Sequence, residues 1–210
     1  MKFLYPQKPK RIYDVSVIPK SYFFQIKKNG WRAEIQSDNG FIIKNRQGSK
    51  LSRGNSDDWK FLEDIFPKPF HIDGELIGTR QAGRLLNHMV IWDIPVIGGN
   101  DFTNLPYIER YNILMSYIDA AKKHLDPTDD NKFGTYEIET NNNHGLFLSM
   151  NFEQKDFNKI WKIVVNEELK NRPSLPVNEG LVFKNPNAKD LWNFYKTSQH
   201  VNQLKLKTVD

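Results

Sequence analysis

A lysine that could serve as a nucleophile lies at the end of an apolar run near the start of the chain. Lys27 is followed by Asn29 and Gly30, and Arg32 comes next, so an amine, a tight turn and an anion-binding group fall within six residues. A neutral lysine amine can form a covalent intermediate. The same residues also fit an ordinary hairpin, because Asn-Gly readily adopts the positive φ values of a two-residue loop. Alone, the segment favours the plain turn.

Two carboxylates flank a glycine farther along the chain. Asp73 and Glu75 alternate with the apolar residues Ile72 and Leu76, which in a strand places both acids on one face. Acids that face a cavity are costly unless they bind a ligand. Acids that face water need no ligand, so the pattern leaves both interpretations open.

Three further segments could carry chemistry, and each also has an ordinary structural explanation. Trp92 and Asp93 lie in an apolar run that would serve equally well as a core strand. Glu179 precedes a glycine and an apolar strand. Lys205 and Lys207 alternate with leucines, so their ammonium groups share one strand face. That face suits a phosphate, although an exposed terminal strand has the same pattern.

The elements that must position these residues follow from hydrophobic periodicity and turn residues. Alternating or short apolar runs predict strands, and apolar spacings of three and four residues predict helices. The early strands follow one another as hairpins and the helices fall between strand groups, so the fold class is α+β with much antiparallel sheet. Strands are expected over residues 22–27, 31–36, 41–45, 70–77, 89–94, 135–140, 146–150, 180–183 and 203–207, and helices over 56–66, 106–124 and 153–169.

The helix expected over residues 106–124 has the clearest pattern, because Pro106 occupies the favoured first-turn position. In the helix expected over residues 56–66, helical spacing places Trp59, Leu62 and Phe66 on one face. Such stripes are typical of core contacts. The stripe of the long helix consists of Tyr107, Tyr111, Leu114, Ile118 and Ala121.

The composition narrows the classes of protein that fit. The 210 residues contain no cysteine, which excludes disulfides, thiolate nucleophiles and cysteine-ligated zinc. The five histidines show no metal-ligand spacing, and the acidic loop at 126–132 lacks the glycine of a calcium loop. No apolar run is long enough for a membrane span or a signal peptide, so we expect a cytoplasmic (intracellular) protein without membrane contact. The net charge of +5 modestly favours polyanionic partners.

Taken in chain order, these segments resemble the motif series of the covalent nucleotidyltransferases, which comprise ATP-dependent DNA ligases, RNA ligases and mRNA capping guanylyltransferases. The resemblance spans residues 25–207. It is closest to the adenylation domain of ATP-dependent DNA ligases, notably the bacterial end-joining type. The matching segments are residues 27–32, 45–48, 73–75, 92–93, 106–110, 179–180 and 205–207.

The resemblance implies a nucleotidyltransferase fold, ATP-grasp-like and shared by DNA and RNA ligases, in which helices flank antiparallel sheets. Residues 21–210 would form the adenylation domain, preceded by a basic, proline-containing arm over residues 1–20 without persistent helical or strand periodicity. DNA ligases continue into an OB-fold domain, whereas this chain ends three residues after Lys207. The C-terminal OB domain is therefore expected to be lacking. The chain would then be a minimal stand-alone enzyme, a domain of a longer protein, or a subunit whose partner supplies the OB function.

The resemblance also implies a reaction. Lys27 would attack the α-phosphorus of ATP, with Mg²⁺ or alternatively Mn²⁺, and would keep AMP as a phosphoramidate. AMP would then pass to the 5′-phosphate of a nicked or broken nucleic acid, and a 3′-hydroxyl would displace it. DNA is favoured as the substrate. The alternatives are an RNA ligase, a capping guanylyltransferase and a non-catalytic nucleic-acid-binding module.

Roles for named side chains follow from the same resemblance. Lys27, Lys205 and Lys207 would be catalytic, the last two by stabilising the phosphoryl oxygens. Glu179 would be the first metal contact and Glu75 the second. The nucleotide-binding residues would be Gln25, Ile26, Arg32, Arg46, Glu75, Trp92 and Lys184.

Within this scheme Trp92 would stack on the adenine, and Arg32 and Arg46 would bind the ribose or the 5′-phosphate through their forked donors. The family's usual aspartate before the glycine is Asn29 here, which keeps the turn and loses a charge. Lys28 should face away from the preceding lysine by strand alternation and has no assigned catalytic role.

Overall fold

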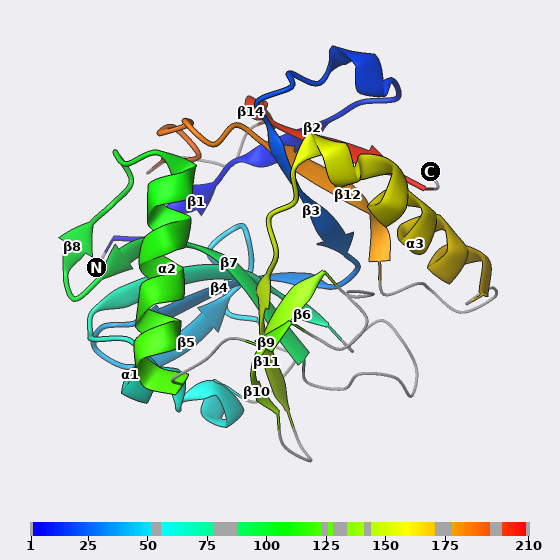
Figure 1. Ribbon diagram of the computed structural model, residues 1–210. Coiled ribbons are helices and arrows are strands. Elements are labelled where there is room, and N and C mark those ends of the chain that lie inside the picture. The colour runs from blue at the N-terminus through cyan, green and yellow to red at the C-terminus, as the bar shows by residue number, and fades with distance from the viewer. Residues whose placement is uncertain are drawn as a thin grey trace.

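Two large sheets organise the molecule, as the computed structural model shows (Figure 1). Within the described residues the strands form sheets of two, four and eight strands, and three α-helices accompany them. The predicted α+β class is therefore confirmed. The structure describes residues 2–51, 56–77, 88–122, 126–127, 134–140, 144–170, 178–193 and 199–208.

The eight-stranded sheet contains the hairpins predicted from alternation. Its order is β5, β4, β6, β7, β11, β10 and β9, with β8 paired to β7. Pairing is antiparallel except between β7 and β11, which are parallel. The strands are β4 Trp31–Ser37, β5 Phe41–Lys44, β6 Phe70–Ile77, β7 His88–Ile97, β8 Asn100–Asp101, β9 Asp126–Pro127, β10 Thr135–Thr140 and β11 Gly145–Ser149.

The four-stranded sheet carries the lysines of the opening and closing segments. Its order is β2, β14, β12 and β3, with β2 parallel to β14 and the other pairs antiparallel. Because β12 lies between β3 and β14, Gly180 pairs with Lys27 on one side and with Lys207 on the other. The strands are β2 Lys8–Arg11, β3 Phe23–Lys28, β12 Asn178–Lys184 and β14 Gln199–Lys207.

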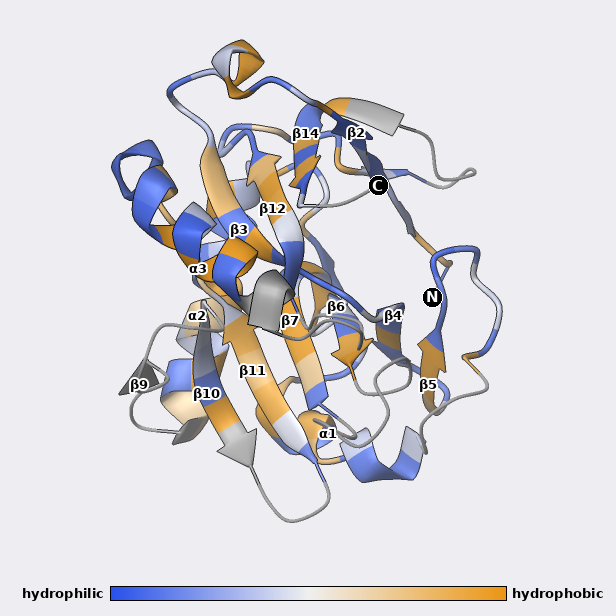
Figure 2. Ribbon diagram, turned by 90° about the vertical axis from the view of Figure 1, so that its right-hand side faces the viewer, coloured by the Kyte–Doolittle hydropathy of each residue, from blue (hydrophilic) through white to orange (hydrophobic). Residues whose placement is uncertain are grey.

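Each sheet has its own helix and its own apolar core. Helix α2 (Tyr107–Lys122) packs the predicted stripe against the eight-stranded sheet, and α3 (Phe157–Lys170) packs Ile160 and Val164 against the four-stranded sheet. Figure 1 shows the two helices on these separate parts of the molecule. Figure 2 shows hydrophilic residues covering the outer side of α3. The chain therefore folds as two packed halves, which leaves a junction between them.

Three helix predictions need correction. The helix expected over 56–66 is a 3-10 turn, η2 (Ser56–Trp59), followed by the four-residue α1 (Leu62–Ile65), although its apolar residues are buried as predicted. Ala121 is exposed, because it lies in the last turn of α2 beyond the core. The helix expected over 153–169 begins with a 3-10 turn, η3 (Gln154–Asp156). Residues 123–124 of the long helix and residues 128–132 of the acidic loop lie outside the described residues.

The first twenty residues contain strands that periodicity does not predict. Strand β1 (Tyr5–Pro6) pairs with β13 (Trp192–Asn193), and β2 pairs with β14. A 3-10 turn, η1 (Val15–Val17), follows them. The absence of a persistent period therefore does not prevent regular structure here, because pairing with distant strands fixes a segment that is too short and too proline-rich to show a period.

Candidate active site

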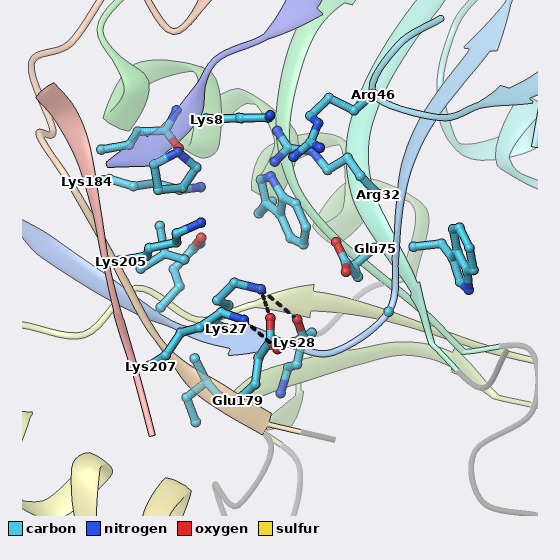
Figure 3. Close-up of a pocket in the computed structure, with 18 of the residues that line it drawn as sticks. Lys8, Lys27, Lys28, Arg32, Arg46, Glu75, Glu179, Lys184, Lys205 and Lys207 are labelled. Carbon is cyan, nitrogen blue, oxygen red and sulfur yellow. Dashed lines mark hydrogen bonds and ion pairs between the residues drawn. The ribbon is translucent and has the colours of Figure 1, made fainter. Parts of the chain in front are cut away.

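A cavity of about 380 Å³ lies at the junction of the two large sheets (Figure 3). Strands of both sheets contribute to its wall, which brings together segments that are far apart in the sequence. Among the described residues that line it, eight side chains are cationic and two are acidic. The cationic residues are Lys8, Lys27, Lys28, Arg32, Arg46, Lys184, Lys205 and Lys207, and the acidic ones are Glu75 and Glu179.

Lys27, the predicted nucleophile, lies at the end of β3 in this cavity. Its Nζ forms an ion pair with Glu179 Oε1 and lies 3.3 Å from the carbonyl oxygen of Lys28. Figure 3 shows both contacts as dashed lines. The amine and its carboxylate partner are each partly accessible, with 21% and 17% of the side chain exposed. A small ligand in the cavity can therefore reach the amine.

Glu179 also binds a lysine of strand β14. Lys207 Nζ donates to Glu179 Oε2 at 3.2 Å, so one carboxylate joins two ammonium groups. Burial alone would raise the pKa of Glu179, but the charges of Lys27 and Lys207 lower it below its ordinary value. The side chain is therefore ionised and accepts hydrogen bonds from both lysines.

Lys205 and Lys207 share a strand face, as the alternation predicts, and both line the cavity. Burial lowers the pKa of Lys205, and the nearby charges of Lys27 and Lys207 lower it further. These ammonium groups repel one another when no anion is bound. The arrangement therefore favours a ligand with negative charge.

Arg32 and Trp92 meet on the opposite wall through Asp73. Arg32 donates from Nε and Nη2 to Asp73, and Trp92 Nε1 donates to Asp73 Oδ2 at 2.6 Å. The Arg32 guanidinium lies 5.1 Å from the centre of the Trp92 ring. Arg32 also interacts electrostatically with Glu75, so the two acids of β6 act on the same side, as predicted. Asp73 orients the residues of the wall, while Glu75 lines the cavity itself.

Glu75 differs from the other acids in its contacts. In the described part of the chain its carboxylate has no hydrogen bond or ion pair, although it lines the cavity. Burial raises the pKa of Glu75 and the charge of Glu179 adds to this effect, while Lys27 and Arg32 oppose it. Such a carboxylate is available to bind a cation or a ligand hydroxyl.

Arg46 reaches the cavity from a tight turn after β5. Asn45 Oδ1 accepts from the backbone nitrogens of Gln47 at 2.9 Å and Ser49 at 3.1 Å, and Gly48 has a φ of +84°. An Asx turn and a left-handed glycine therefore shape this loop. Burial lowers the pKa of Arg46, and the charge of Arg32 lowers it further.

Lys184 and Gln25 both line the cavity and both contact the same aromatic residue. Lys184 Nζ lies 4.4 Å from the centre of the Tyr107 ring, and burial lowers the pKa of Lys184 to about 7. Gln25 Nε2 donates to the Tyr107 hydroxyl at 3.0 Å. Ile26, which follows Gln25 in β3, lines the cavity as well. Every predicted site residue is thus brought to one place.

Two residues behave differently from their sequence patterns. Asp93 points away from the cavity and binds Arg110 Nε and Nη2 at 2.8 Å each, so it is part of the core. Lys28 also lines the cavity, yet its Nζ donates to Asn178 Oδ1 at 2.9 Å and not to Glu179. Its ammonium group thus has a partner different from that of the nucleophile.

Sequence reasoning missed Lys8 and Tyr107. The helical stripe predicts only a core role for Tyr107, and its position directly after Pro106 in a matching segment is the available signal. Lys8 was assigned to a basic arm, and no local pattern distinguishes it from the neighbouring Lys10. Only the pairing of β2 with β14 brings Lys8 to the cavity.

Solved structures with a similar fold are DNA ligases. The ligase domain of M. tuberculosis LigD has 13% identity and a TM-score of 0.61, over 97% of this chain and 59% of that chain. A mycobacterial DNA ligase D complexed with ATP and MES has 12% identity and a TM-score of 0.63, over 99% and 61%. The Chlorella virus DNA ligase-adenylate has 14% identity and a TM-score of 0.61, over 97% and 68%.

The chain has the fold of the adenylation domain of ATP-dependent DNA ligases. It spans 59% of the LigD ligase domain and 61% of the mycobacterial ligase D chain. No protein-family model and no curated protein sequence matches it. The likeness to DNA ligases therefore rests on tertiary structure and on the short segments that occur in the same order along the chain as the ligase motifs. In the described part of the chain, no helix has the length and apolar character needed to cross a membrane.

Proposed function

We propose that this chain catalyses ATP-dependent strand joining and becomes adenylylated on Lys27. The observation that carries the proposal is the Lys27–Glu179 pair at a cavity with eight cationic side chains. The amine would form a bond to the α-phosphorus of ATP, and the bond from that phosphorus to pyrophosphate would break. Glu179 is hydrogen-bonded to the amine and is placed to accept its proton.

The cations of β14 would stabilise the reacting phosphate. Lys205 and Lys207 lie beside the nucleophile on one strand face, where negative charge develops on the phosphoryl oxygens. Arg32 and Arg46 offer forked donors to the ribose or to a 5′-phosphate, and Trp92 offers an aromatic surface to the base. Arg32, Trp92 and Lys207 are already held by carboxylates of the protein, Asp73 for the first two and Glu179 for the third.

The two carboxylates of the cavity fit a magnesium ion. Mg²⁺ is commonly bound by one or two carboxylates with substrate phosphates and water, and Glu75 has no hydrogen bond or ion pair among the described residues. Glu179 and Glu75 would hold the ion, which when bound would withdraw charge from a phosphate oxygen. The described residues contain no group of three or more metal-ligating side chains. Substrate oxygens and water would complete the coordination.

Adenylate transfer to a nucleic acid would follow. The 5′-phosphate of a nick would attack the adenylate phosphorus and release Lys27, and a 3′-hydroxyl would then displace AMP. DNA is the favoured substrate because the similar solved structures are DNA ligases.

Labelling with α-labelled ATP and Mg²⁺ tests the first step. We expect label that stays on the wild-type chain through denaturation, and none on Lys27→Ala, because this substitution removes the proposed nucleophile that pairs with Glu179 in the cavity. Lys20→Ala, an exposed lysine outside the cavity, is the control and should keep the label. Equal labelling of Lys27→Ala and wild type would reject the covalent mechanism.

The substrate can then be identified with nicked duplexes. Nicks with DNA or RNA on each side, incubated with the labelled chain, should receive AMP on the 5′-phosphate. Sealing of DNA nicks supports the proposal, and sealing only of RNA nicks would replace it with RNA ligation. Labelling by GTP and not by ATP would indicate a capping guanylyltransferase.

A further inference from the structure

The N-terminal segment joins the two halves of the molecule at the cavity. Phe3 lies on the eight-stranded sheet, with its ring centre 5.6 Å from that of His71 and 5.1 Å from Lys44 Nζ. Leu4 is buried in the core of that sheet. The chain then pairs with β13 and, through β2, with the four-stranded sheet. Residues 3–11, here called the strap, therefore cross from one half to the other.

Lys8 lies where the strap passes the cavity. It lines the same cavity as Arg46, and in Figure 3 both side chains lie on the side of the cavity away from Lys27 and Glu179. Among the described residues, the Lys8 ammonium group has no hydrogen bond or ion pair. A half-buried cation without a protein partner favours an anion from outside the chain.

The same strap positions Arg46. Phe3 packs on the turn that carries Arg46, since a Cβ added at Gly48 would lie 3.2 Å from the Phe3 ring. Arg32 lies close enough to lower the pKa of Arg46 by its charge. Three cations from three strands or turns thus line the same part of the cavity, on the side away from Glu179 in Figure 3.

We propose that Lys8 is a phosphate-binding residue, which forms with Arg32 and Arg46 an anion site at this end of the cavity. The phosphate could belong to the polyphosphate chain of a nucleotide or to the 5′-end of a strand. Both sources offer the same oxygen acceptors to an ammonium and two guanidinium groups. Both of these phosphate sources are substrates of the proposed ligase function, so the choice between them rests on that function. The proposal that Lys8 binds an anion does not depend on it.

Binding measurements in metal-free buffer test this site without any catalytic step. Calorimetry with inorganic tripolyphosphate addresses the first source. Fluorescence anisotropy with a nicked DNA duplex, carrying either a 5′-phosphate or a 5′-hydroxyl at the nick, addresses the second. The variants are Lys8→Met, which keeps the aliphatic stem, and Lys8→Arg, which keeps the charge. Lys10→Met, an exposed residue of the same strand outside the cavity, is the matched control.

We expect Lys8→Met to weaken tripolyphosphate binding about tenfold, or to abolish the preference for the 5′-phosphate nick by about the same factor. The first result assigns the nucleotide phosphates and the second assigns the strand end. Lys8→Arg should retain binding, and Lys10→Met should match wild type. The site is rejected if Lys8→Met binds both probes as Lys10→Met does. It is also rejected if the wild-type chain does not bind tripolyphosphate and shows no preference for the nick with a 5′-phosphate. These results are readable even if Lys27 forms no adenylate.

Discussion

Arg32 is held by a series of buried polar side chains and not by one partner. Besides Asp73, its Nε lies 3.2 Å from Glu34 Oε1, and Glu34 Oε2 lies 3.1 Å from His71 Nε2. Burial lowers the pKa of His71 to about 3, so its ring is neutral. Gln36 Nε2 lies 3.4 Å from His71 Nδ1 and donates to it, so Nε2 carries the hydrogen and donates to Glu34. The orientation of Arg32 thus depends on residues outside the cavity.

Because Glu34 is buried in this network, the free energy of unfolding should depend on pH. Burial raises the pKa of Glu34 from its ordinary value of 4.5 to about 7. The folded chain binds this proton more tightly than the unfolded chain, so the stabilisation is complete below pH 4.5 and is lost as the pH rises to about 7. Relative to Glu34→Gln, the wild-type free energy of unfolding should fall by about 3 kcal/mol over this range. Urea denaturation at each pH measures the difference.

Glu153→Gln provides an exposed comparison, because Glu153 forms a surface ion pair with Lys155 at 2.7 Å. A wild-type stability that stays parallel to that of Glu34→Gln from pH 4.5 to 7.5 would contradict the role of Glu34.

At the scale of elements, the close approach of β12 and β14 builds the centre of the site. Gly180 has a φ of +145°, and a Cβ added there would lie 2.0 Å from the carbonyl oxygen of Leu206. Only glycine permits this spacing without a shift of the strands. The spacing brings Lys207 beside Glu179, which in turn holds Lys27.

Gly180→Ala should therefore separate β12 from β14. We expect a loss of at least about 2 kcal/mol in the free energy of unfolding and a slower formation of the Lys27 adduct. Gly40→Ala is a matched control, because Gly40 has a similar φ of +142° but nothing lies within 4 Å of its added Cβ. Thermal or urea unfolding of both variants, with labelling by ATP, measures the effect. Equal losses in the two variants would show that backbone strain, and not strand spacing, is responsible.

At the scale of the whole molecule, the site lies between two separately packed halves. One core contains the residues of α2 and the eight-stranded sheet, and the other contains those of α3 and the four-stranded sheet. The cavity between them gathers eight cations and two acids. Since the net charge of the chain is only +5, the positive charge is concentrated where a polyanion would bind.

The clustering of cationic side chains in the cavity predicts that nucleic-acid affinity depends strongly on salt. If at least about four of the cavity cations contact phosphates, raising the salt from about 50 to about 200 mM should weaken binding about 100-fold, because bound counterions are released on association. Fluorescence anisotropy of a 5′-phosphorylated nicked duplex with Lys27→Ala measures this without adenylylation. An affinity that changes less than about threefold would argue against phosphate contacts in the cavity.

Much of the fold could be predicted from the sequence, because strand alternation and helical spacing are local properties. The alternation of Lys205 with Lys207 and of Asp73 with Glu75 placed each pair on one face, and the structure confirms both. The 3-10 turn at η2 and the strands β1 and β2 could not be predicted, because local patterns do not specify how a segment packs or which distant strand it pairs with.

By itself the sequence determined which side chains could do chemistry and the order in which they occur. Only the tertiary structure decided that Lys27 shares Glu179 with Lys207, that Asp93 turns to Arg110 in the core, and that Lys8 reaches the cavity. The physical reason is that such partners are set by sheet pairing, burial and charge between segments far apart in the chain, and these forces act only once the two halves have packed together.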